Sequence, residues 1–165
     1  MQRSLLALIS GALLFANRGA QSSKAASIQG VWHTVQVVTT GPGARTITVP
    51  EPRPNLTILT AKHYSRVEVH ADGPRPSPAD AAKATAEELR AVWGPFFGEA
   101  GTYEITNANV ITMRPTVAKD PAAMARGAFV TRTFRMQGDT LWVTDQRNER
   151  GTIANPVTAK LVRVQ

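Results

Sequence analysis

Short stretches in which apolar and polar residues alternate recur along most of the chain. They are rich in Val, Ile, Thr and aromatic residues, and Gly, Pro, Asn or Asp bounds most of them, as is typical of β-strands joined by turns. We therefore expect about nine strands. The predicted ranges are Ile28–Val38, Arg45–Val49, Asn55–Thr60, His63–His70, Thr102–Thr106, Val110–Pro115, Ala128–Gln137, Thr140–Gln146 and Val157–Gln165.

One segment between the fourth and fifth predicted strands breaks this pattern and is rich in Ala and Glu. Ser77 offers a capping hydroxyl directly before Pro78, and Gly94 follows the last apolar residue, which are start and stop signals of a helix. The pattern predicts a helix from residue 78 to about Trp93. We expect its apolar face to dock against the β structure or to form a lid over it.

Many short strands at even spacing favour an antiparallel sandwich or a closed barrel. The chain has 165 residues, which suits one domain, and no cysteine, so packing alone must hold its core together. A closed barrel has the added advantage that it leaves no exposed strand edges.

The first 22 residues have the layout of a secretory signal peptide. Arg3 gives a basic start, an apolar run follows from Leu5 to Ala16, and Ala20 and Ser22 fit a cleavage site. The apolar run is short for a stable membrane anchor, and no Cys follows it to carry a lipid. We expect residues 1–22 to be the signal, 23–27 a short linker and 28–165 the folded domain of an exported protein, either periplasmic or secreted.

The formal net charge is +7, and it is +5 without Arg3 and Arg18. The remaining basic residues are scattered, and no stripe of basic and aromatic residues is present, so nucleic-acid binding is not expected. A weak preference for anionic molecules is compatible with this charge.

Gly30-Val31-Trp32, in the first predicted strand, resembles the Gly-x-Trp motif of the lipocalins and their calycin relatives. In those barrels the Trp plugs the closed base, and a basic residue from a late strand stacks over it. The resemblance implies a structural role at the barrel base for Gly30 and Trp32, with Arg163 as the cation–π partner. Arg132 and Arg135 are the alternatives to Arg163.

The resemblance extends from about Ile28 to Val164 and is strongest to the bacterial lipocalin-like domain family. It includes the segments FFGEAGTYEI, NVITMRPTVAKDPAAM and RTFRMQGDTLWVT. The family implies an all-β fold, an antiparallel up-and-down barrel of about eight strands, here with one inserted α-helix. It implies no particular reaction or ligand.

In such a barrel alternate residues of each strand face the lumen, but a slip of one residue reverses every assignment. Thr34 and Gln36 share a strand face with Trp32. Arg132 has the type of side chain that binds a carboxylate or phosphate, with outward solvation or stacking on Trp32 as the alternatives. The candidate ligand-binding residues are Thr34, Gln36, Phe97, Tyr103, Glu104, Arg132 and Phe134.

Motifs for catalysis or metal binding are not evident. Arg66, Glu68 and His70 share one strand face, which we interpret as a polar outer face. The three histidines have no metal-binding spacing, and neither a G-x-S-x-G motif nor a phosphate-binding glycine loop occurs. We assign no catalytic residue, metal or cofactor.

Three hypotheses about function follow. The first is an exported lipocalin-like protein that binds a small, mostly apolar molecule, either uncharged or with an anionic group near Arg132. The alternative is a calycin-type enzyme, an isomerase or cyclase acting on a lipophilic substrate, with Glu104 beside Tyr103 or Arg132. A third is a structural module without a cavity. We expect a monomer or weak dimer.

Overall fold

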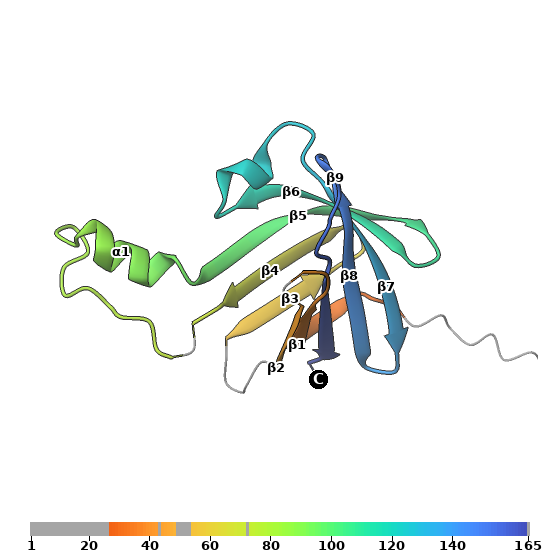
Figure 1. Cartoon of the computed structure of the whole chain (residues 1–165), viewed down its shortest axis with the longest axis horizontal. Helices are drawn as coiled ribbons and strands as arrows, with labels where there is room; N and C mark the ends of the chain where they lie inside the picture. Colours follow the sequence, from red (N-terminus) through yellow and green to blue (C-terminus); the bar gives the residue numbers. More distant parts are fainter. Residues whose placement is uncertain (1–26, 43, 49–53, 72, 165) are drawn as a thin grey trace, which may run out of the picture.

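The described part of the chain forms a closed antiparallel β-barrel of eight strands, with two additional short strands and one α-helix (Figure 1). The computed structural model describes residues 27–42, 44–48, 54–71 and 73–164. Each barrel strand pairs with the next one along the chain, and the last strand pairs with both of its neighbours to close the sheet. Of the two architectures that the pattern allowed, the barrel is therefore the observed one.

The barrel strands follow the predicted ranges closely except for β5. They are β1 Gly30–Thr39, β3 Asn55–Leu59, β4 His63–Val69, β5 Phe96–Asn107, β6 Val110–Ala118, β7 Val130–Gln137, β8 Thr140–Asn148 and β10 Val157–Arg163. The extra strands are β2 Arg45–Thr48, which pairs with β1, and β9 Gly151–Thr152, which pairs with β8. A single turn of 3-10 helix, η1, spans Pro121–Met124.

β5 begins six residues earlier than the alternation predicts. Two glycines interrupt the apolar pattern in its first half, yet that half pairs with β4 in continuous register from Phe96 to Thr102. At Gly101 a side chain would collide with the backbone of Arg114 and Pro115 on β6. Gly101 thus permits a close approach of two strands, rather than marking the end of one.

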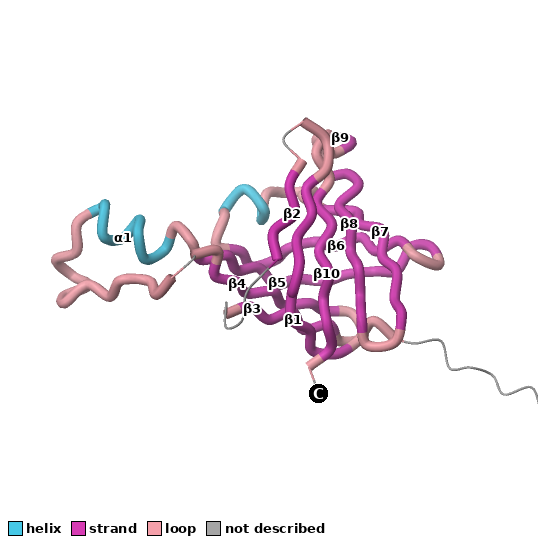
Figure 2. Tube along the Cα trace, turned by 60° about the horizontal axis from the view of Figure 1, so that its bottom comes forward, coloured by secondary structure: helices cyan, strands magenta, loops and turns pink. Residues whose placement is uncertain are grey.

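The helix α1, Ala86–Trp93, is half as long as predicted and begins at a different cap. Thr85 and Glu88 form a capping box, which satisfies the first backbone donors at this point rather than at Ser77. The prediction that the helix docks on the barrel or covers it is wrong: α1 has no buried residue. Figures 1 and 2 show it standing away from the barrel.

Trp32 closes one end of the barrel. Its side chain is fully buried, and its indole N–H donates to the carbonyl of Ile28 at 2.9 Å. The guanidinium carbon of Arg163 lies 4.2 Å from the centre of the indole, and its two terminal nitrogens donate to the carbonyls of Gln29 and Ser27. Arg163 is the partner that the resemblance implies. Gly30, at φ +145°, leaves the space that this guanidinium occupies.

A β-bulge in β1 reverses its alternation directly above this base. Thr34 pairs with Leu161 and Gln36 with Lys160, so Val35 is the extra residue. The side chain of Asn55 bonds both backbone groups of Thr34, at 2.6 Å to the N–H and 3.1 Å to the carbonyl. Beyond the bulge Val37 lies opposite Ala159, which lines the lumen, so Gln36 faces outward. The prediction that Gln36 shares the face of Trp32 is therefore wrong.

The core surrounds the Trp32 end of the lumen. Its buried members are Ile28, Trp32, Leu59, Tyr64, Tyr103, Ile111, Met113, Leu141 and Leu161. The predicted signal and all but the last residue of the predicted linker lie outside the described residues. Within the described part of the chain, no helix has the length and apolar character needed to cross a membrane.

Replacing Arg163 with Lys should lower the free energy of unfolding by about 2 kcal/mol, because an ammonium cannot reproduce the fork that reaches two carbonyls while covering the indole. Urea denaturation gives this value. Arg135→Lys is the matched control, since Arg135 stacks on the outer Trp142 from an exposed position and should cost at most about 0.5 kcal/mol. Equal losses in the two variants would contradict a special role for the base.

Candidate functional site

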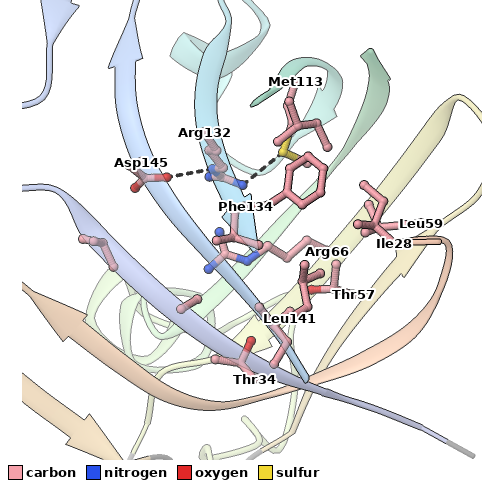
Figure 3. A pocket seen from close by; sticks show the side chains of 15 residues that line it. Ile28, Thr34, Thr57, Leu59, Arg66, Met113, Arg132, Phe134, Leu141 and Asp145 are labelled. Carbon is pink, nitrogen blue, oxygen red and sulfur yellow. Dashed lines mark hydrogen bonds and ion pairs between the residues drawn. The ribbon is translucent and has the colours of Figure 1, made fainter. Parts of the chain in front are cut away.

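The barrel lumen contains a cavity of about 70 Å³, measured as the space open to the centre of a water molecule. Ten of its fifteen lining residues are apolar, and Figure 3 shows how they surround two arginine side chains. The lining residues are Ile28, Thr34, Thr57, Leu59, Arg66, Ile111, Met113, Arg132, Phe134, Leu141, Val143, Asp145, Val157, Ala159 and Leu161. A barrel filled completely by its own side chains is thereby excluded.

Arg132 enters the cavity from β7. Its Nε donates to Oδ1 of Asp145 at 2.7 Å, and its Nη1 contacts the sulfur of Met113 at 3.2 Å (Figure 3). Thioether sulfur is a weak acceptor, so the ends of this guanidinium retain most of their capacity to donate. Its side chain is only 14% exposed.

Arg66 enters the same cavity from β4 and is held by Glu68 on the same strand. Its Nε and Nη2 donate to the two carboxylate oxygens at 2.7 and 3.0 Å, which is the strong bidentate form of this contact. Burial lowers the pKa of Arg66, but the charge and hydrogen bonds of Glu68 raise it by more. The guanidinium carbon also lies 4.7 Å from the centre of the Phe97 ring.

Glu68 is buried and remains ionised. Burial raises its pKa, but the hydrogen bond with His70 and the charge and hydrogen bonds of Arg66 together lower it to about 2. Nε2 of His70 lies 2.9 Å from the second carboxylate oxygen, and the His70 ring stacks on Phe97. These contacts correct the prediction that Arg66, Glu68 and His70 occupy a polar outer face: Arg66 and Glu68 belong to the interior.

Tyr64 adds a buried phenol next to these charges. Burial and the nearby Glu99 raise the pKa of Tyr64, whereas Arg132 and Arg66 lower it less. Its hydroxyl is enclosed and has no hydrogen-bond partner among the described residues. Glu99 lies opposite Arg66 in the β4–β5 register, so the lumen receives a third carboxylate.

The predicted ligand-binding residues separate into two groups. Thr34, Arg132 and Phe134 line the cavity. Gln36 lies outside it because of the bulge, and Phe97 lies beside Arg66 without lining the cavity. Ligand binding by these residues stays a prediction.

Tyr103 and Glu104 occupy a different part of the barrel. The Tyr103 hydroxyl donates to the carbonyl of Thr60, so its only proton is already engaged. Glu104 faces outward, is 55% exposed and pairs with Arg114 at 2.7 Å. The enzyme hypothesis therefore loses the carboxylate on which it depended.

Three charged residues lie in the interior although the sequence pattern does not predict it: Arg66, Glu68 and Asp145. A charged residue at every second position of a strand is usually solvated. Tyr64 could have identified the interior face of β4, because Tyr64, Arg66 and Glu68 are alternate residues and therefore lie on one face of the strand. Asp145 lies on the same face of β8 as the apolar residues Leu141 and Val143.

No family model matches this chain, and no curated protein matches its sequence. Within the described residues, no three or more His, Asp or Glu side chains converge in a way that could hold a metal ion. The arrangement that remains is an apolar chamber with two paired guanidinium groups.

Replacing Glu68 with Gln should destabilise the barrel in a pH-dependent way. Because the pKa of Glu68 is lower in the folded state, its ionised form stabilises the fold above about pH 4.5, and that contribution disappears as the pH falls toward 2. The variant should be less stable at pH 7 by on the order of 3 kcal/mol. The gap from the wild type should close between pH 4.5 and 2.

Urea denaturation at several pH values measures this gap. Glu104→Gln removes a carboxylate from the outer surface and serves as the control, with an expected effect within about 1 kcal/mol at every pH. A gap for Glu68→Gln that stays constant from pH 7 to pH 2 would contradict the assignment.

Proposed function

We propose that this protein is an exported, lipocalin-like carrier that binds a small, mostly apolar molecule inside its barrel. The cavity in the lumen is the observation that carries the proposal, because ten of its fifteen lining residues are apolar. The Gly30-Val31-Trp32 motif, with Arg163 over the indole, supports the lipocalin-like assignment. The layout of residues 1–22 supports export.

The size of the cavity limits the ligand. One water molecule needs roughly 10–15 Å³ of space measured in this way, so a cavity of 70 Å³ accepts on the order of five to seven non-hydrogen atoms. Burial of apolar ligand surface supplies most of the binding energy, and the few polar groups fix the orientation. For ligands this small we expect dissociation constants of about 0.1–1 mM.

Filling the cavity should abolish binding. Ala159→Leu places three additional carbon atoms against the lumen, because Ala159 lines the cavity from β10. With pentane, benzene and 2-pentanone as probes, the ¹³C resonance of the Met113 methyl group should shift in the wild type and should lose at least about nine-tenths of that shift in the variant. Met124, 43% exposed and outside the barrel, serves as the internal reference.

Ala91→Leu is the matched control, because it adds the same three carbon atoms at an exposed position of α1. It should bind the probes as the wild type does. If no probe shifts the Met113 resonance of the wild-type protein, the carrier proposal fails.

A further inference from the structure

The polar groups that face the cavity are not balanced between donors and acceptors. The Nε of Arg132 is engaged by Asp145, and two nitrogens of Arg66 are engaged by Glu68. The nitrogens left over belong to guanidinium groups, which only donate. Apart from the Met113 sulfur, these nitrogens have no hydrogen-bond acceptor among the described residues. A ligand that satisfies them must bring a hydrogen-bond acceptor.

The charges of the same region restrict what kind of acceptor this is. Two guanidinium groups stand among three carboxylates, those of Glu68, Glu99 and Asp145. Each arginine is already neutralised by a partner at 2.7 Å. His70, which is 57% exposed, contacts Glu68 from the rim and at most cancels the remaining negative charge.

A carboxylate ligand would therefore gain little from the arginines. It would enter a partly buried space in which Asp145 is a lining residue, and like charges there disfavour the ionised form. A neutral carbonyl oxygen accepts the same guanidinium hydrogen bonds without that repulsion. Hydrogen bonds to a charged donor contribute more than neutral ones.

We propose that the barrel selects an uncharged carbonyl compound, such as a small ketone or amide, whose oxygen accepts from Arg132 and Arg66 while its alkyl part lies against Leu141, Val143 and Leu161. This inference rests on the proposed carrier function and specifies its ligand class. The sequence left open an uncharged ligand or one with an anionic group near Arg132, and this proposal selects the uncharged ligand.

Three probes of equal size test it: 2-pentanone, butanamide and butanoate each have the same shape and differ in the polar end. A fourth, 2-methylpentane, lacks the acceptor. Titrations at pH 7 that follow the Met113 methyl resonance should give dissociation constants at least about tenfold lower for the ketone or the amide than for butanoate or the hydrocarbon.

Asp145→Asn should reduce this discrimination against butanoate to about threefold or less, because it removes one repelling charge and keeps an amide oxygen for Arg132. Glu104→Gln removes a carboxylate from the outer surface and should leave the ratio unchanged. The double variant Arg132→Met/Asp145→Leu replaces the pair with apolar groups and should abolish the preference for the ketone over the hydrocarbon.

The outcomes separate the two proposals. If butanoate binds wild-type protein as tightly as the amide or more tightly, the preference for a neutral carbonyl is wrong and the carrier function stands. If the hydrocarbon binds as well as the ketone, the arginines do not recognise a hydrogen-bond acceptor. The preference for a neutral carbonyl is then wrong, and the carrier function again stands. If none of the probes shifts Met113, both fail. The wild-type comparison decides even if a variant does not fold.

Discussion

Closure of the sheet through β10 is the constraint on which the rest of this structure depends. Because β10 pairs with β8 on one side and β1 on the other, every barrel strand in the described part of the chain has two neighbouring strands. Closure also divides each strand into an inner and an outer face. Whether a side chain faces the lumen or the solvent then depends on its odd or even position along the strand and on any bulge that precedes it.

The energetic cost of this arrangement is concentrated in the lumen, where the Arg66–Glu68 and Arg132–Asp145 ion pairs are largely taken out of water. A buried ion pair gains stability only if its geometry is good and its remaining atoms are satisfied. Arg66 and Glu68 meet this condition through two short bonds and the contact with His70. Arg132 meets it only in part, because Asp145 engages its Nε alone. The incompletely satisfied pair is therefore the place where the proposed ligand would add the most hydrogen bonds.

Most of the strands could be predicted from the sequence because alternation is a local pattern, although β5 begins earlier and α1 is shorter than predicted. The base of the barrel was predicted from the resemblance to the lipocalins. Alternation with period two located the strands, and the Gly-x-Trp motif pointed to the contact between Trp32 and Arg163. Gln36 was placed on the wrong face because alternation alone does not reveal the bulge, at which the backbone of Thr34 bonds to Asn55, 21 positions away. The interior location of Arg66 and Glu68 was not predicted because each charge lowers the free-energy cost of burying the other. Hydrophobicity assigned to single residues does not reveal such a pair. The predicted helix was too long because Ser77 and Thr85 are both suitable N-caps and the structure uses Thr85. No buried residue of α1 stabilises a longer helix.

The position of the two arginines along the barrel connects the fold with the size of the proposed ligand. At one end the buried Trp32 lies beneath the guanidinium of Arg163. Further along β4, Arg66 and Phe97 lie against one another, and His70 follows at the more exposed end. The apolar chamber between these two levels is short, with a volume of 70 Å³, whereas pockets for drug-sized molecules span roughly 300–1,000 Å³. A long acyl chain would exceed this volume and would extend beyond the residues that line the cavity. The volume of the cavity is therefore the reason that the proposed ligand is a short molecule and not a long lipid.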